Sequence, residues 1–198
     1  RRAIDCLGQI VAPFEGVRRH ERFHFLLPAV SSRVWLAACH AELGTFAEGR
    51  ILGEEGLRIA SAVNHPASLM RASLGIGLLF LRQGDLQRAL LWLERAVGIG
   101  QDADLPAYFP WMAAALGAAY ALGGRVTDAV SLLTQGIEQA TAMEMGGFQA
   151  LCTLSLGEAQ LLAGRLEEAH ALAERALALT REHQERGNQA YALHLLGD

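Results

Sequence analysis

The chain has 198 residues, of which 52% are hydrophobic and 19% are charged, and its formal net charge at pH 7 is −4. A chain of this length can bury an appreciable core, and an acidic balance without a basic cluster argues against direct binding of nucleic acid. The three cysteines lie far apart without CxxC spacing and no secretory signal is visible, so we expect reduced thiols and a cytoplasmic protein.

Residues 1–29 come first, and we interpret them as a partial repeat unit. Residues 1–20 take the place of the second helix of a repeat, but Pro13 lies in their interior. Proline removes a backbone donor and clashes with the preceding turn, so it predicts a kink or an early end of this helix.

The same segment contains a literal HExxH motif, formed by His20, Glu21 and His24. On a helix this spacing can place two imidazoles on zinc beside a glutamate general base. The motif lies near a junction between units and no distinctive third-ligand motif follows it, so a zinc hydrolase is an alternative that the context does not favour. We predict a protein that is not an enzyme, with no catalytic residue, no metal site and no cofactor.

From residue 30 onward, similar side chains recur every 40 residues, most clearly at Gly44, Gly84, Gly124 and Gly164. Self-similarity at this scale is the signature of stacked helix pairs, and apolar residues recur at helical spacing on both sides of each glycine. The sequence therefore predicts an all-α, right-handed α-solenoid in a single domain, 1–198. We place its repeats at about 30–64, 65–104, 105–144 and 145–184, followed by a truncated repeat at 185–198.

Each repeat is predicted to contain a first helix, helix A, and a second helix, helix B. A glycine just past helix A ends it cheaply in the left-handed conformation, Asp85 can cap the helix that follows, and Pro66 and Pro106 suit the first turn of helix A. We place helix A near 30–43, 66–83, 106–123 and 146–163, and helix B near 46–62, 86–101, 126–142 and 166–184.

Small residues recur inside these helices. Gly77, Gly117 and Gly157 lie within helix A, where glycine costs about 1 kcal/mol relative to alanine. Close approach of a neighbouring helix would offset this cost. Helix B carries small residues in a column of its own, Ala89, Ala129 and Ala169.

Residues 105–124 carry no charge and are about long enough to span a bilayer. Leu116 and Gly117 nevertheless fall on the repeat columns, and Pro106 and Pro110 crowd the start of the stretch. We therefore expect a repeat helix and no membrane span.

The repeat columns resemble the tetratricopeptide repeat (TPR) family, whose pattern has leucine-glycine in helix A, an aromatic three residues on, a turn glycine and an alanine in helix B. The period here is longer than is usual in the family, and His40 and Gln160 replace the aromatic in the outer units. The best match is formed by Ile76, Gly77, Phe80, Gly84, Leu86, Ala89, Leu93, Ala96 and Val97.

A more particular resemblance is to the C-terminal TPR regions of large bacterial signalling proteins, those with a class III adenylate or guanylate cyclase or a LuxR-type output and an ATPase domain. It is carried by the stretches at 18–23, 116–133 and 156–179. None of the cyclase or ATPase residues is present, so the resemblance implies a regulatory segment of a larger protein. Because the last repeat is cut, we expect a fragment of a longer array that self-associates weakly through its truncated ends.

Repeats of this family generally bind ligands on the concave side, which helix A lines. The resemblance therefore implies a mostly apolar partner-binding set, Val34, Ala38, Arg71, Leu74, Leu78, Trp111, Ala114, Ala118, Leu151, Leu154 and Glu158. Any of these residues could instead pack against the next helix. The predicted function is a protein-protein interaction and regulatory scaffold whose partner is a protein, a peptide or another domain of the same polypeptide, with a small-effector sensor as the alternative.

Overall fold

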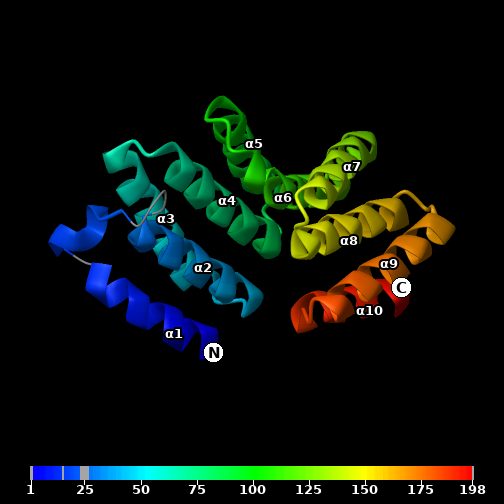
Figure 1. Cartoon of the computed structure of the whole chain (residues 1–198), viewed down its shortest axis with the longest axis horizontal. Helices are drawn as coiled ribbons and strands as arrows, with labels where there is room; N and C mark the ends of the chain where they lie inside the picture. The colour runs from blue at the N-terminus through cyan, green and yellow to red at the C-terminus, as the bar shows by residue number, and fades with distance from the viewer. Residues whose placement is uncertain (1, 15, 23–26, 198) are drawn as a thin grey trace. The chain divides into compact units, whose positions relative to one another are not determined.

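The computed structural model describes residues 2–14, 16–22 and 27–197, and within these ranges every regular element is helical. The chain forms two compact units, Arg1–Leu105 and Pro106–Asp198, drawn in Figure 1. The first contains α1 (Arg2–Val11), the short 3-10 helices η1 (Ala12–Phe14) and η2 (Gly16–His20), α2 (Pro28–Glu42), α3 (Phe46–Val63), α4 (Pro66–Gln83) and α5 (Leu86–Asp102). The second contains the 3-10 helix η3 (Pro106–Tyr108), α6 (Phe109–Leu122), α7 (Val126–Ala142), α8 (Gly146–Leu162), α9 (Leu166–Glu182) and α10 (Arg186–Gly197).

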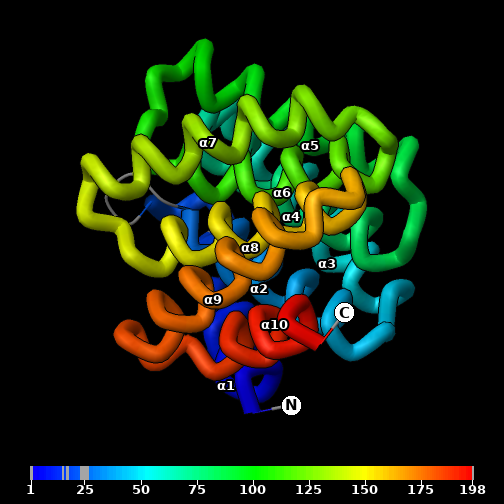
Figure 2. Tube along the Cα trace, turned by 90° about the vertical axis from the view of Figure 1, so that its right-hand side faces the viewer, coloured from blue at the N-terminus to red at the C-terminus, as the bar shows by residue number. Residues whose placement is uncertain are grey.

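The long helices are arranged as successive pairs. In the first unit α2 packs on α3 and α4, and α4 packs on α5; in the second, α6 packs on α7 and α8, and α8 packs on α9. Figure 2 shows α8, α9 and α10 side by side at the end of the chain. The even-numbered helices from α2 to α8 are thus helix A of a pair, and the odd-numbered helices from α3 to α9 are helix B.

Helix A is the buried member of each pair, as α6 shows most clearly. Every residue from Pro110 to Gly117 is buried, as expected for a core helix that is apolar on all sides. Its partner α7 buries one face alone, formed by residues three and four positions apart: Ala129, Leu133, Gly136 and Ala140.

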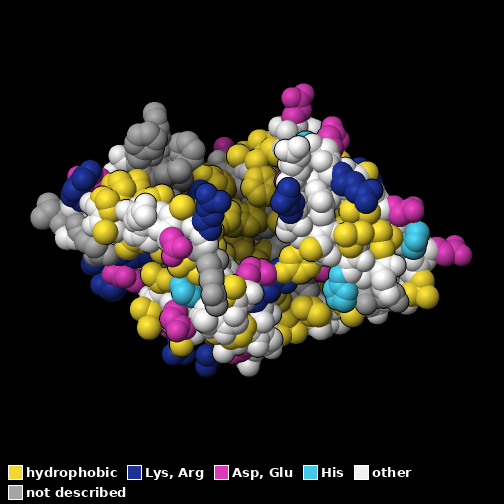
Figure 3. Space-filling view, turned by 90° about the horizontal axis from the view of Figure 1, so that it is seen from below, with side chains coloured by type: hydrophobic (Ala, Val, Ile, Leu, Met, Phe, Trp, Pro, Cys, Tyr) yellow, Lys and Arg dark blue, Asp and Glu magenta, His cyan; other side chains and the backbone are white. Residues whose placement is uncertain are grey.

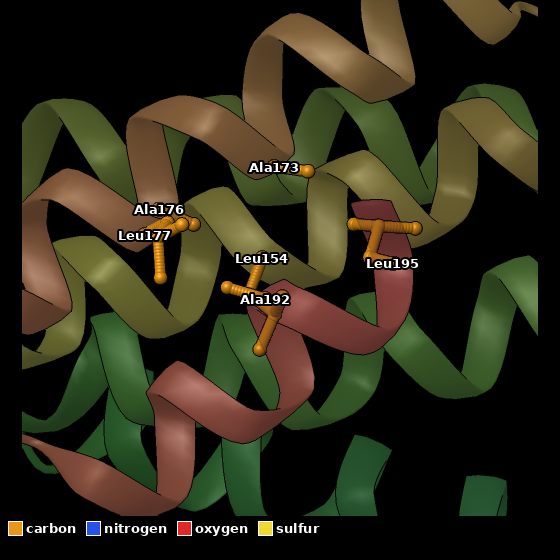
Figure 4. Close-up of a cluster of buried hydrophobic side chains, with 6 residues drawn as sticks. All are labelled: Leu154, Ala173, Ala176, Leu177, Ala192 and Leu195. Atoms are coloured by element: carbon orange, nitrogen blue, oxygen red, sulfur yellow. The ribbon is translucent and has the colours of Figure 1, made fainter. Parts of the chain in front are cut away.

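The core is shared between helices of neighbouring pairs rather than enclosed within one. In the cluster of Figure 4, Leu154 of α8 meets Ala173 and Leu177 of α9 and Leu195 of α10. Alanines at the contact keep the backbones close, so small side chains contribute to packing as much as large ones do. Within each unit, neighbouring pairs therefore stabilise one another.

The turns from helix A to helix B are closed by glycine. Gly44, Gly84, Gly124 and Gly164 have φ of 74°, 83°, 75° and 73°. After each glycine, the next backbone N–H bonds to the carbonyl five residues earlier, as from Asp85 to Phe80 at 3.0 Å, which is the Schellman arrangement. The expected cap is confirmed, since Asp85 Oδ1 accepts a hydrogen bond from the Arg88 backbone N–H at 3.1 Å.

The turns from helix B to the next helix A have the same backbone geometry without glycine. Asn64, Asp104, Glu144 and Gln184 have φ of 49°, 49°, 55° and 56°. Here too an N–H reaches back five residues, as from Met145 to Ala140 at 2.8 Å. The repeat pattern predicted a break between helix B and helix A at these positions, but not its left-handed geometry, because glutamate and glutamine seldom adopt positive φ.

The start of α6 differs from the sequence expectation, whereas the end of α1 agrees with it. Helix α6 begins at Phe109, whereas we expected a helix from about 106. Pro110 has no N–H to donate to the Pro106 carbonyl, and that carbonyl accepts instead from Gln139 Nε2 at 2.8 Å. Near the N-terminus, α1 ends at Val11 and η1 contains Pro13, in line with the early helix end that this proline predicts.

The helix-interior glycines lie where another side chain comes very close. A Cβ on Gly77 would lie 2.6 Å from Leu93 Cδ2, one on Gly117 would lie 2.5 Å from Leu133 Cγ, and one on Gly157 would lie 2.7 Å from Leu195 Cδ2. The small residues of helix B lie in the core as well, since Ala89, Ala129 and Ala169 are buried.

None of the helices that the structure describes combines the length and the apolarity that crossing a membrane requires. The uncharged stretch 105–124 is divided between η3 and α6. The count of one domain, the repeat boundaries, the hand of the array and its 40-residue period stay predictions.

Candidate functional site

The eleven residues of the predicted partner-binding set fall into two classes of exposure. Val34, Arg71, Leu74, Trp111, Ala114 and Leu154 are buried, and Ala38, Leu78, Ala118, Leu151 and Glu158 are half-buried. Buried side chains pack inside the fold and offer no surface to a partner. The part of the set that remains accessible is therefore mainly the column Ala38, Leu78, Ala118 and Glu158, together with Leu151.

In the first unit the accessible positions include a residue that the repeat register did not predict. Trp35 on α2 is 44% exposed and lies three positions before Ala38, on the same helix face. The residues at the same repeat position in the later repeats are all buried: Gly75, Ala115 and Ser155. The repeat pattern therefore did not indicate that Trp35 is exposed. Tryptophan is enriched among the residues that dominate protein interfaces.

The first-unit surface ends at an ion pair between neighbouring A helices. Arg82 Nε of α4 donates to Glu42 Oε1 of α2 at 2.9 Å. This exposed pair is expected to contribute little stability, but it places a charged border beside Trp35, Ala38 and Leu78 on the same two helices. We refer to these three residues as the apolar strip of the first unit.

The second unit presents a related surface with different chemistry at its end. Leu122 of α6 and Leu162 of α8 occupy the positions of Glu42 and Arg82 and are both exposed. Ala118 and Glu158 are half-buried one turn earlier on the same helices. Inside this unit, Trp111 stacks on Phe148 with ring centroids 6.3 Å apart, so Trp111 is part of the packing.

Arg71 is the one basic residue of the predicted partner-binding set, and it is only 8% exposed. The most buried arginine of the first unit is Arg33, whose Nη1 donates to the Ala29 carbonyl at 2.9 Å and whose Nε lies 3.1 Å from Glu55 Oε2. Glu55 also pairs with Arg19 at 3.1 Å. This cluster connects η2, α2 and α3, and the burial of Arg33 indicates a structural role, since a buried charge must be paired.

The HExxH segment lies only partly within the described residues. His20 ends η2 and is exposed, and the Glu21 carboxylate is held by Arg18 at 2.9 Å. That hydrogen bond lowers the pKa of Glu21. His24 lies outside the described residues. Across 2–14, 16–22 and 27–197, no three His, Cys, Asp or Glu side chains gather as a metal site would require.

The histidines and cysteines have local roles that their scatter in sequence does not reveal. His65 caps α4, since its Nδ1 accepts a hydrogen bond from the Ser68 backbone N–H at 3.3 Å. The pKa of His65 is lowered, mainly by burial and also by the positive charge of Arg22. Cys6 is exposed and Cys39 half-buried, whereas Cys152 is buried and its thiol donates to the Pro110 carbonyl at 3.1 Å. Burial raises the pKa of Cys152 to about 12.

Charges on the surface are mixed in sign. On the face drawn in Figure 3, arginine and acidic side chains are interspersed with apolar ones, as the net charge of −4 suggests. Nucleic-acid binding usually requires basic side chains gathered on one face. Figure 3 shows no such gathering among the described residues on that face.

Comparison with known proteins agrees with this architecture. A family model described as tetratricopeptide repeat matches residues 58–104, which contain the α4–α5 pair. No curated protein sequence gives a significant match to this chain.

Solved structures share the fold over nearly the whole chain. BtubC (BKLC) from P. vanneervenii is similar with a TM-score of 0.76 and 18% identity, over 99% of this chain and 81% of that protein. Another similar structure is a Signal Transduction ATPase with Numerous Domains (STAND) protein with a tetratricopeptide repeat sensor, from Pyrococcus horikoshii. Its TM-score is 0.69 and its identity 13%, over 98% of this chain and 29% of that protein. A Rap protein complexed with competence and sporulation factor has a TM-score of 0.64 and 16% identity, over 98% of this chain and 56% of that protein.

Identities this low establish a shared fold and nothing about a shared activity. The chain is an all-α protein with TPR-like helix pairs of the α-solenoid class, a class that typically serves as a scaffold for binding other proteins.

Proposed function

We propose that this chain is a protein- or peptide-binding module that acts as a regulatory scaffold within a larger bacterial signalling or transcription-regulatory protein. The observation that carries the proposal is the apolar strip of the first unit. Its exposed tryptophan lies beside the half-buried Ala38 and Leu78 on two adjacent A helices. Exposed apolar surface bordered by charges is typical of an interaction site.

The chemistry of the strip favours an apolar segment of a polypeptide as the ligand. Ala38 is small and Leu78 is aliphatic, so together with Trp35 they offer apolar contact with few hydrogen-bonding groups. The buried Arg71 is poorly placed to hold a peptide carboxylate. A partner would therefore be anchored by an apolar side chain against Trp35, with polar contacts at the Glu42–Arg82 border.

Two structural neighbours support a regulatory context for the proposal. One contains a TPR sensor within a signal-transduction ATPase, and another was solved in complex with competence and sporulation factor. By analogy, the partner here would be a protein, a peptide or another domain of the same polypeptide, in the cytoplasm. The output domain of the resembled cyclase and LuxR-type proteins is a further expectation that the flanking coding sequence would test.

The test uses matched truncations of two exposed apolar side chains. The immobilised chain is incubated with a soluble extract of the cells that encode it, alongside Trp35→Ala and the control Leu91→Ala. Leu91 is 65% exposed but lies on α5, a B helix. Binding at the strip is supported if a protein is retained by the unmodified chain and by Leu91→Ala but is lost with Trp35→Ala. The loss of affinity for that protein should reach about tenfold or more. Equal retention by all three chains would contradict it.

The alternative function is a small-effector sensor built on the same helices. The sensor described for the STAND neighbour motivates it. A ligand that binds only the native state raises the apparent stability, so an increase in Tm with a metabolite, without any retained protein, would favour the sensor.

The zinc hydrolase is the second alternative. Stoichiometric zinc in untagged protein, lost in His20→Ala, would favour it.

A further inference from the structure

The turn between α9 and α10 contains a polar pocket that the apolar strip does not use. Its volume is about 270 Å³, and it is lined by four side chains, Arg181, Gln184, Arg186 and Gln189. Pockets for drug-sized molecules are mostly apolar and measure about 300 to 1,000 Å³. A smaller and polar pocket suits a small charged group better than an apolar peptide.

The two charged side chains that line this pocket are both positive. Arg181 lies in the last turn of α9 and Arg186 is the first residue of α10. Within the described part of the chain, neither guanidinium forms an ion pair. A cation at the first residue of a helix opposes the helix dipole, so an anion held between the two arginines would relieve an unfavourable arrangement.

The side chains of His183 and Glu185, in the same turn, do not line the pocket. A Cβ on Gly146 would overlap the His183 ring, and one on Gly147 would overlap the Glu185 carboxylate, so both side chains lie against the first turn of α8. Glu185 also accepts a hydrogen bond from Asn188 Nδ2 at 2.8 Å. The Glu185 carboxylate therefore interacts with residues that do not line the pocket, and the two arginines remain available to a ligand.

We propose that this pocket binds a small oxyanion with two negative charges, of the phosphate or dicarboxylate class. Two guanidinium groups can supply paired, charge-assisted hydrogen bonds to such an anion. The amides of Gln184 and Gln189 offer further donors, and Gln189 is held in place because its Nε2 also donates to the Thr180 carbonyl at 3.0 Å.

The arginine pair is particular to this turn. The corresponding positions of the three earlier turns from helix B to helix A contain no basic residue: Ser61 and Pro66, Gln101 and Pro106, Thr141 and Gly146. An anion site here therefore follows from the side chains and not from the turn geometry that all four turns share.

The experiment titrates the whole chain with inorganic phosphate and, separately, with succinate, and follows backbone amide chemical shifts by NMR. Ionic strength is held constant with chloride, because exposed charges are screened by salt. We expect saturable shifts centred on 181–189 with at least one of the two anions, and the anion that binds identifies the ligand class. Arg181→Gln and Arg186→Gln should each weaken binding by about tenfold.

Arg175→Gln is the matched control, since Arg175 is exposed on the same helix α9 but does not line the pocket. It should bind as the unmodified chain does. All three positions are exposed, so circular dichroism should show the same helical signal for every variant. Absence of saturable shifts with both anions would overturn the proposal, as would equal affinity in the arginine variants and the control.

Discussion

The helix-interior glycines show how a locally unfavourable residue can be required by packing. At Gly117 a Cβ would lie 2.5 Å from Leu133 Cγ, and Leu133 is fully buried in the α6–α7 contact. Gly98 of α5 is the opposite case, since nothing lies within 4 Å of its Cβ position. The same residue type therefore has opposite effects on stability at two helical sites.

We predict that Gly117→Val lowers the free energy of unfolding by about 1 to 3 kcal/mol, because the added side chain overpacks the contact with Leu133. Gly98→Ala should instead raise it by about 0.5 to 1 kcal/mol, because alanine has the higher helix propensity and the space is open. Urea denaturation measures both changes. Equal midpoints for Gly117→Val and the unmodified chain would contradict the packing role.

The buried thiol of Cys152 makes stability depend on pH in the alkaline range. Its pKa is raised by burial from 9.0 to about 12 in the native state, so between these values the unfolded chain is deprotonated while the native thiol keeps its proton. This contribution to stability is complete below pH 9 and is lost as the pH rises toward 12, at up to about 1.4 kcal/mol per pH unit.

We therefore predict that the free energy of unfolding falls more steeply between pH 9 and 10.5 in the unmodified chain than in Cys152→Ala. Comparing the two slopes removes the contribution of other groups that titrate in this range. A thiol reagent should also label the exposed Cys6 well before Cys152. Parallel pH slopes for the two proteins would show that the native thiol is not protected.

At the scale of the helices, the two kinds of turn were predicted unequally well. The glycines after helix A identify their turns, because glycine adopts positive φ at little cost. The turns at Asn64, Asp104, Glu144 and Gln184 have the same geometry without glycine, so the repeat pattern placed these turns but propensity could not reveal their positive φ. The start of α6 was missed for a different reason: Pro110 removes the local hydrogen bond to the Pro106 carbonyl, and Gln139, which is distant in sequence, bonds to that carbonyl instead.

Glu144→Gly should stabilise the chain by about 0.5 to 1 kcal/mol, because it removes the cost of a left-handed glutamate at φ 55° and this gain exceeds the added freedom of the unfolded chain. The matched change in a glycine turn, Gly124→Ala, should destabilise by about 1 kcal/mol. Thermal unfolding of both variants measures the difference. A lower Tm for Glu144→Gly would mean that the Glu144 side chain makes a stabilising contact.

The candidate site was predicted less completely than the fold. The register identified the helices that carry the accessible surface, but six of its eleven residues are buried. A repeat pattern predicts what equivalent positions have in common, so it cannot predict the exposure of Trp35, because the equivalent residues of the other repeats are small and buried. Nor could it indicate the anion pocket, which depends on two arginines that occur in one turn alone.

For the molecule as a whole, association is predicted from the last helix. Leu193 of α10 is 54% exposed, and Ala190 is exposed one turn earlier, whereas Ala192 and Leu195 face the core. An exposed apolar helix face is a common interaction surface. We predict weak self-association of the isolated chain that Leu193→Glu shifts toward monomer without loss of helical signal.

Light scattering after size exclusion, over a range of concentrations, measures that shift. Leu91→Glu is the control, because Leu91 is 65% exposed on a B helix, and it should leave the association unchanged. A chain that stays monomeric at every concentration would contradict the prediction.

In the proposed mode of binding, the A helices contact the partner while the B helices support them. Hydrogen-deuterium exchange of the chain, with and without a protein captured through the apolar strip, tests this claim. We predict added protection in peptides that cover Trp35 to Ala38 of α2 and Leu78 of α4, with little change in α3 and α5. Protection confined to α3 and α5 would contradict the claim.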